Sequence, residues 1–202
     1  MRRSLFVLLI AGAGLLTGCS TDPRLDRGTQ YLTGSGAIST QADRGRPDFD
    51  NISYWDGDSI SGPASIVIRL SEQRAYFYKG PQLVGVSSLS TGREGHNTPT
   101  GNYKIIRKDK DHASSRYGDY IDAVTGAPVK KDIDTLKDPK PPGAKYDGAK
   151  MPFFMEIMPA IGMHEGFLPG MPASHGCIRM PSFMAEAFFR NVSVGTPVKV
   201  LP

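Results

Sequence analysis

Cys177 is the residue of this chain best suited to nucleophilic chemistry, and two histidines stand close to it in the sequence. The stretch from His164 to Arg179 reads HEGFLPGMPASHGCIR, so His164 precedes the cysteine by thirteen positions and His175 by two. A cysteine attacks as its thiolate, and a histidine can take the thiol proton and later return it to a leaving amine. We therefore expect thiol–imidazole catalysis, with either histidine able to serve as the base.

Residues beside Cys177 add features that acyl transfer would use. Gly176 allows a tight backbone turn that frees the Cys177 amide to point at a developing oxyanion. Arg179 could pair with a carboxylate of the substrate. The alternative is a zinc site, since His164, His175 and Cys177 are ligand types at short spacing. The chain has no C-x-x-C pair and no H-E-x-x-H motif, so we expect neither a metal nor another cofactor.

The chain's other cysteine, Cys19, ends a sequence typical of export. A basic pair precedes an apolar run over residues 5–16, which is short for a membrane-spanning helix. The sequence LTGC at residues 16–19 resembles a bacterial lipobox, whereas an ordinary secretory peptide is the alternative. The lipobox predicts a signal peptide over 1–18, a lipid anchor at Cys19 and, because Ser20 follows, the outer membrane facing the periplasm.

Lipidation of Cys19 would leave Cys177 without an intrachain partner in an oxidising compartment. An unpaired exported cysteine is a candidate reactive thiol, although a buried free cysteine that only fills space is the alternative. The net charge of +4 over 202 residues comes without a long Lys/Arg block, so nucleic acid is a poor candidate partner. The 39% hydrophobic content supports one folded domain plus some unpacked chain.

The elements that would position Cys177 are mainly strands. Residues 19–62 are rich in Gly, Ser, Thr, Asp and Arg and predict a flexible tether, and residues 63–202 predict a mainly β domain with few helices. Ser182 is the expected N-cap of a helix whose apolar residues share one face. The predicted strands are Ile66–Leu70, Arg74–Tyr78 and Leu83–Leu89 (the last two a hairpin), Tyr103–Arg107, Phe153–Met158 and a closing strand through Val198 and Val200.

A polar segment of about residues 108–150 interrupts this pattern. It contains much of the chain's Lys and Asp together with a Pro/Gly cluster at residues 139–143, a composition that predicts no core of its own. A loop of this length inside a domain is usually a cover for a site, a binding loop or a disordered insertion. His96 and His112 stand in polar sequence and are expected to be solvated.

Four ordered motifs make the chain resemble the YkuD-type L,D-transpeptidases, cysteine enzymes of the bacterial cell wall. Ser174 to Arg179, SHGCIR, is similar to the family's S/T-H-G-C signature, and IGMH at residues 161–164 matches the place of its catalytic histidine. SLSTGREGHNTPTGNYKI, residues 88–105, resembles the family's S-T-G and T-P-x-G segment, and GTPV at residues 195–198 its closing strand. The resemblance implies a β-sandwich-like catalytic domain.

The resemblance also implies roles for single residues. Cys177 would be the nucleophile and His164 the general base and acid, held by the backbone carbonyl of Glu165 or a neighbour. His175 and Gly176, together with Ser174 before them, would border or orient the oxyanion hole. Glu165 stands where the family more often has a small residue, and its charge would raise the pKa of His164 if the side chain faces inward.

The reaction implied is acyl transfer on peptidoglycan stem peptides. Cys177 would attack the carbonyl between the third and fourth stem residues, release the terminal D-amino acid and form a thioester that an amine then resolves. The acceptor could be a second stem peptide, a protein lysine, a free D-amino acid or water. The alternatives are a hydrolytic L,D-carboxypeptidase or amidase on the same fold and a non-catalytic peptidoglycan-binding lipoprotein.

Overall fold

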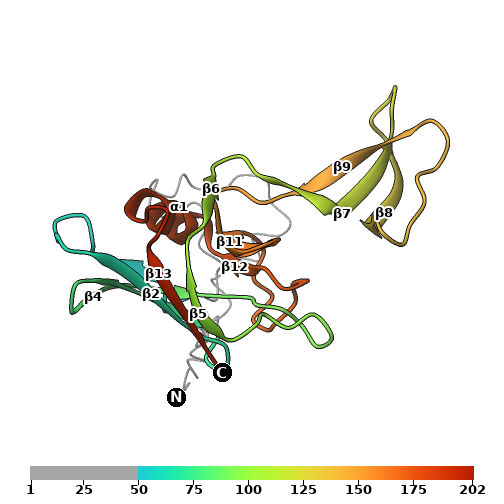
Figure 1. The fold of residues 1–202 in the computed structure, drawn as a ribbon. Coiled ribbons are helices and arrows are strands. Elements are labelled where there is room, and N and C mark those ends of the chain that lie inside the picture. The colour runs from blue at the N-terminus through green and yellow to red at the C-terminus, as the bar shows by residue number, and fades with distance from the viewer. Residues whose placement is uncertain (1–49) are drawn as a thin grey trace, which may run out of the picture. The chain divides into compact units, whose positions relative to one another are not determined.

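The computed structural model describes residues 50–202, so the predicted signal peptide, Cys19 and the tether up to residue 49 lie outside the described residues. Most of the described chain is β structure, with a single helix, as the sequence predicted (Figure 1). No helix in this part of the chain has the length and apolar content needed to cross a membrane. The elements are β1 (Tyr54–Trp55), β2 (Ala64–Arg69), β3 (Arg74–Lys79), β4 (Gln82–Ser88), β5 (Gly101–Lys104), β6 (Arg107–Asp109), β7 (Ala113–Asp122), β8 (Pro128–Asp134), β9 (Ala144–Lys150), β10 (Phe154–Met158), β11 (Ile161–Glu165), β12 (Ile178–Met180), α1 (Ser182–Asn191) and β13 (Pro197–Leu201).

The strands form three sheets among the described residues. A six-stranded sheet has the order β1-β4-β3-β2-β13-β5, a four-stranded sheet the order β12-β11-β10-β6, and a three-stranded sheet the order β8-β7-β9. The predicted hairpin is confirmed as β3 and β4, and the closing strand β13 runs parallel to β2. Alternating side chains of β2 and β13 face inward, so Ile66, Ile68, Val198 and Val200 are buried.

The main core collects buried side chains from the six-stranded sheet, the four-stranded sheet and α1. Phe188 of α1 packs against Phe77 of β3 with ring centroids 4.8 Å apart. The predicted helix is confirmed, but the prediction that Ser182 is its N-cap was wrong. Ser182 is the first helical residue, and Pro181 occupies the N-cap position. The Ser182 hydroxyl donates to the Glu165 carboxylate at 2.9 Å. The serine therefore joins the helix to β11 instead of satisfying a free amide at the helix start.

The folded part begins before residue 63, which corrects the predicted end of the tether. Trp55 of β1 lies on the main core, with its ring centroid 5.0 Å from that of Phe77, and β1 pairs with β4. The sequence around Trp55 is too polar to show a strand pattern, and one large aromatic ring supplies most of its packing.

The predicted strand over Tyr103–Arg107 is divided between two sheets. The amide of Ile105 donates to Thr196 at 2.9 Å, and the next amide, of Ile106, donates to Glu156 at 2.8 Å. The chain thus leaves the six-stranded sheet after β5 and enters the four-stranded sheet as β6. Ile105 is buried in the main core and Ile106 is 48% exposed.

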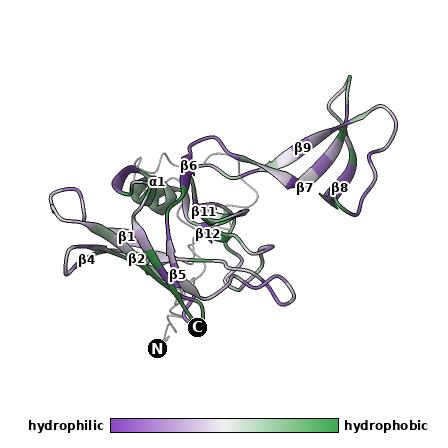
Figure 2. Cartoon of the chain, in the orientation of Figure 1, coloured by the Kyte–Doolittle hydropathy of each residue, from purple (hydrophilic) through white to green (hydrophobic). Residues whose placement is uncertain are grey.

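The polar segment forms a sheet with a small core of its own, contrary to the prediction. β7, β8 and β9 lie side by side (Figure 1). Tyr120, Ile133 and Ala144 form a small buried cluster, with Tyr146 packed against it. These few apolar residues are too widely spaced to give a sequence signal, and Figure 2 shows how much of β8 is hydrophilic. Ladder hydrogen bonds and ion pairs complete the sheet. We call residues 113–150 the insertion sheet.

Candidate active site

The two proposed catalytic residues are positioned by neighbouring parallel strands: His164 lies on β11, and Cys177 directly precedes β12. β11 pairs with β12 so that His164 is opposite Arg179. The Cys177 thiol, just before β12, lies near Ala160 and Gly162 at the beginning of β11. Because alternate residues of a strand share a face, Gly162 and His164 are on one face of β11.

His164 is held in one tautomer by the backbone. Its Nδ1 donates to the carbonyl of Glu165 at 2.6 Å, and since a carbonyl can only accept, the proton must be on Nδ1. The other ring nitrogen, Nε2, is then free to take a proton. The ring is 5% exposed, and this burial lowers the pKa of His164 to about 4, which keeps the imidazole neutral at ordinary pH.

The Cys177 thiol is held as a neutral group in this state. Its Sγ lies 3.5 Å from the carbonyl of Ala160, its hydrogen-bond partner among the described residues. Burial raises the pKa of the thiol, whereas the Gly162 amide and the charge of Arg179 act in the opposite direction. A neutral thiol can react when a neutral imidazole takes its proton as the sulfur attacks.

The SHGC loop is fixed by hydrogen bonds along its own backbone. Gly176 N donates to Ser174 Oγ at 3.0 Å, and that hydroxyl donates to the carbonyl of Cys177 at 2.5 Å. Gly176 has φ +116°, a conformation that residues with a side chain rarely adopt. Ser174 and Gly176 thus set the backbone that carries Cys177.

Residues of the segment 88–105 form further hydrogen bonds to the same loop. Thr98 Oγ1 donates to the carbonyl of Gly176 at 2.8 Å and accepts from the amide of Gly92 at 3.0 Å. The carbonyl of Thr91 accepts from the amide of Ser174 at 3.0 Å. The sequence motifs S-T-G and T-P-x-G therefore belong to the site as supports, a role that their spacing alone did not reveal.

Arg179 directs a half-buried positive charge toward the thiol. Its stem covers Gly166, where a Cβ would come within 2.9 Å of it, and its backbone exchanges hydrogen bonds with Ser90. Burial lowers the pKa of Arg179, and the guanidinium has no hydrogen-bond or ion-pair partner among residues 50–202. An unpaired guanidinium beside the nucleophile can receive a carboxylate.

His175 is engaged elsewhere than at the thiol. Arg93 donates to its Nε2 at 2.8 Å, and the ring of Tyr117 from the insertion sheet stacks on it at 4.2 Å. Burial first, and then the charge of Arg93, lowers the pKa of His175. Since a guanidinium only donates, Nε2 of His175 is occupied as an acceptor and cannot also take the proton of Cys177.

The carboxylate of Glu165 does not face His164. It accepts from the Ser182 hydroxyl at 2.9 Å, and the influence of Glu165 on the pKa of His164 comes through its backbone carbonyl. The inward orientation considered from sequence is therefore wrong, and Glu165 joins β11 to the beginning of α1.

The remaining histidines are packed, contrary to the expectation that they are solvated. His96 meets the edge of His175 with ring centroids 4.8 Å apart. His112 stacks on Phe154 at 4.2 Å and lies 3.1 Å from a carboxylate oxygen of Asp109. Within residues 50–202, no three His, Cys, Asp or Glu side chains are grouped to hold a metal ion, so the zinc ligand set is not brought together.

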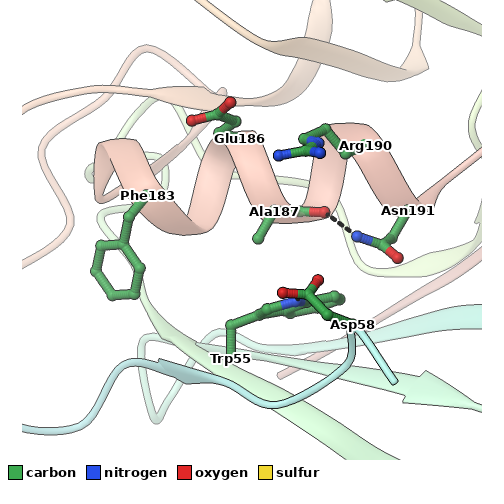
Figure 3. A pocket seen from close by; sticks show the side chains of 7 residues that line it. All are labelled: Trp55, Asp58, Phe183, Glu186, Ala187, Arg190 and Asn191. Carbon is green, nitrogen blue, oxygen red and sulfur yellow. Dashed lines mark hydrogen bonds between the residues drawn. The ribbon is translucent and has the colours of Figure 1, made fainter. Parts of the chain in front are cut away.

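A hollow of about 300 Å³ lies between β1 and α1, away from these residues (Figure 3). Trp55 forms one wall, with Asp58 beside it, and Glu186 and Arg190 project from α1 on the other side. None of the proposed site residues lines this hollow. It carries no reactive group beyond ordinary surface charges.

Comparison with known proteins gives the family of this domain. The family model of the L,D-transpeptidase catalytic domain, YkuD, matches residues 63–200. The chain belongs to this family, which is a family of enzymes.

Solved structures agree with the fold. An L,D-transpeptidase from Mycobacterium smegmatis is 16% identical with a TM-score of 0.51, covering 69% of this chain and 59% of that one. One from Xylanimonas cellulosilytica is 17% identical with a TM-score of 0.51, covering 71% and 62%. The chain thus spans about three fifths of the length of these neighbours. The comparison with curated proteins found no match.

Proposed function

We propose that this protein is a peptidoglycan L,D-transpeptidase in which Cys177 carries the acyl group. The observation that carries the proposal is the hydrogen bond from His164 Nδ1 to the Glu165 carbonyl, because it leaves Nε2 as a proton acceptor on β11, the strand whose beginning lies near the Cys177 thiol. Membership of the YkuD family supplies the substrate class, the stem peptides of peptidoglycan.

The reaction proceeds in two steps. The sulfur of Cys177 attacks the carbonyl between the third and fourth stem residues, and its proton passes to His164 Nε2. The tetrahedral oxyanion forms beside the backbone at Cys177, whose amide is the available donor on this fixed loop, since the Gly176 amide already donates to Ser174 Oγ. The C–N bond then breaks, His164 returns the proton to the leaving D-amino acid, and a thioester remains. An amine attacks the thioester and releases the thiol.

Arg179 binds a carboxylate of the substrate in this proposal. It is the unpaired cation nearest the thiol, and its charge also lowers the cost of forming the thiolate. A stem peptide ends in a carboxylate one residue beyond the attacked bond, within reach of such a group. No cofactor takes part in these steps.

Location follows from the lipobox resemblance. We propose that Cys19 carries a lipid and holds the domain at the outer membrane, facing the periplasm and the wall. Labelled fatty acid should enter the wild-type chain in cells and fail to enter a Cys19→Ala chain. Labelling of that variant would show that the lipid is attached elsewhere.

The test of the reaction is product analysis. The purified full chain is incubated with disaccharide-tetrapeptide, with and without an added D-amino acid. The products are then identified by mass spectrometry. Transfer predicts exchange of the fourth residue, hydrolysis predicts the tripeptide in both cases, and a binding protein gives neither.

Cys177→Ala should lose turnover by several orders of magnitude while keeping its circular dichroism spectrum. Turnover within about tenfold of wild type in Cys177→Ala would overturn the nucleophile assignment.

A further inference from the structure

The insertion sheet contacts the SHGC loop through an aromatic side chain. Tyr117 of β7 stacks on His175 with ring centroids 4.2 Å apart and the ring planes 20° from parallel. His175 stands two residues before Cys177, so the contact joins the insertion sheet to the backbone of the nucleophile. Nothing in the sequence of the polar segment pointed to this tyrosine.

We propose that Tyr117 is a positioning residue for the thiol site: with Arg93 it fixes His175, and through His175 the backbone that precedes Cys177. The proposal rests on the proposed function and adds a role for the insertion sheet. It assigns Tyr117 no contact with the reacting atoms.

His175 is held from several directions although the residue itself is exposed. Arg93 donates to its Nε2 at 2.8 Å, the edge of His96 lies 4.8 Å away, and Tyr117 covers a ring face. An exposed imidazole would otherwise rotate freely among its rotamers. Three contacts on one exposed ring indicate that its orientation matters.

The insertion sheet in turn holds Tyr117. Its amide donates to Ser114 Oγ at 2.9 Å, and its carbonyl accepts from the Tyr146 hydroxyl at 2.7 Å. Arg116 lies over the Tyr117 ring at 4.9 Å and is bound by both carboxylate oxygens of Asp134, at 2.9 and 2.8 Å. The ring is therefore placed by its own backbone and by a fixed cation.

The ring and not the hydroxyl of Tyr117 makes these contacts. No hydrogen bond of its hydroxyl is found in the described part of the chain. Phenylalanine should therefore replace it, whereas alanine should not.

The test compares Tyr117→Ala with Tyr117→Phe in the purified full chain, with Leu136→Ala as an exposed control in the same insertion. Kinetics of D-amino acid exchange measure kcat and KM. Tyr117→Ala should lower kcat about tenfold with a smaller change in KM, because a wall of the transition-state pocket is loosened while binding contacts remain. Tyr117→Phe and Leu136→Ala should stay within about twofold of wild type.

Nuclear magnetic resonance of the histidine rings gives a readout independent of activity. The His175 signals, assigned with His175→Gln, should move in Tyr117→Ala and stay in Tyr117→Phe. The groups facing His175 are Arg93, Arg179, His96 and Asp134. Because burial is the largest cause of its lowered pKa, uncovering the ring should raise the pKa of His175 toward 6.5.

Unmoved His175 signals in Tyr117→Ala would overturn the proposal, and so would moved signals with wild-type kcat. Hydrogen exchange of the β7–β9 amides checks that the variant sheet is folded. If the wild-type chain gives no product at all, the proposed reaction fails. The His175 ring signals in Tyr117→Ala still test whether Tyr117 holds His175, because they do not depend on activity.

Discussion

The insertion sheet and the domain around it differ in how much apolar surface they bury. The main core contains eighteen buried apolar residues from two sheets and a helix, whereas the insertion sheet buries three, with one tyrosine alongside. Burial of apolar side chains is the dominant favourable contribution to folding. Cys177 and His164, the proposed nucleophile and base, therefore lie on the well-packed part. The insertion sheet, which contacts the neighbouring His175 through Tyr117, is more weakly packed.

The main core and the insertion sheet therefore suit different roles. Cys177 and His164 need positions fixed to fractions of an ångström, which packed strands provide. A surface that must let a peptide enter benefits from lower local stability. Asp134 and Asp138 of the insertion sheet have lowered pKa values, Asp134 to about 2, because Arg116 and Lys130 hold them. These carboxylates are exposed, so their ion pairs add only modest stability.

The largest expected effect tests the packed region. His164→Ala should slow acylation about 10²–10⁴-fold, because the thiol then has no base. His175→Ala should leave the ionisation of Cys177 nearly unchanged, since Arg93 already occupies its Nε2. Rates of iodoacetamide labelling across pH measure the thiol pKa in each variant. A raised thiol pKa in His175→Ala alone would show that the base is misassigned.

The pH profile sharpens the same assignment. Burial lowers the pKa of His164 to about 4, and the base is active only when unprotonated. The acid limb of kcat/KM should therefore lie well below the ordinary histidine value of 6.5, with activity retained down to about pH 5. In His164→Ala, activity should instead rise with pH into the alkaline range, because burial raises the pKa of Cys177. A wild-type acid limb at 6.5 or above contradicts the buried, neutral base.

Much of the packed region could be predicted from the sequence, and little of the insertion sheet. The short β-branched run Ile66–Leu70 predicts a strand, and Ile66 and Ile68 of that run are buried in the main core. The insertion sheet depends on Tyr120 and Ile133, which come from different strands and make no local pattern. Cys177 and His164 could be chosen from residue type and motif. Thr98, Arg93 and Tyr117 could not, because contacts between distant segments give them their roles.

A smaller effect should separate the two regions directly. Ile133→Ala and Ile68→Ala remove similar side chains from sites that are 1% and 0% exposed. Large-to-small changes of this kind cost roughly 2–5 kcal/mol. Ile68→Ala should lower the melting temperature of the whole domain, whereas Ile133→Ala should speed hydrogen exchange in β7–β9 and leave β2 and β13 protected.

Equal loss of protection in β2 and β13 for both variants would show that the two regions unfold together. In that case the insertion sheet unfolds together with the main core, and the small size of its own core does not make it unfold separately. Val129→Ala, a change at an exposed site on β8, serves as the control and should leave both regions protected.

The smallest expected effect concerns Glu165. Its carboxylate accepts a hydrogen bond from the Ser182 hydroxyl. Its backbone carbonyl, which any residue provides, accepts a hydrogen bond from Nδ1 of His164. Glu165→Gln keeps the carbonyl and an acceptor for Ser182, so the acid limb of the pH profile should stay where it is and kcat should change less than about twofold. A carboxylate charge near His164 would instead have raised the pKa of His164, and removing that charge would move the acid limb to lower pH.

Glu165→Ala, which also leaves Ser182 without its partner, should lower the melting temperature slightly through the loss of one side-chain hydrogen bond, roughly 1 kcal/mol. A clear shift of the acid limb in Glu165→Gln would mean that the carboxylate acts on the base after all, and that the joint between β11 and α1 is not its whole role.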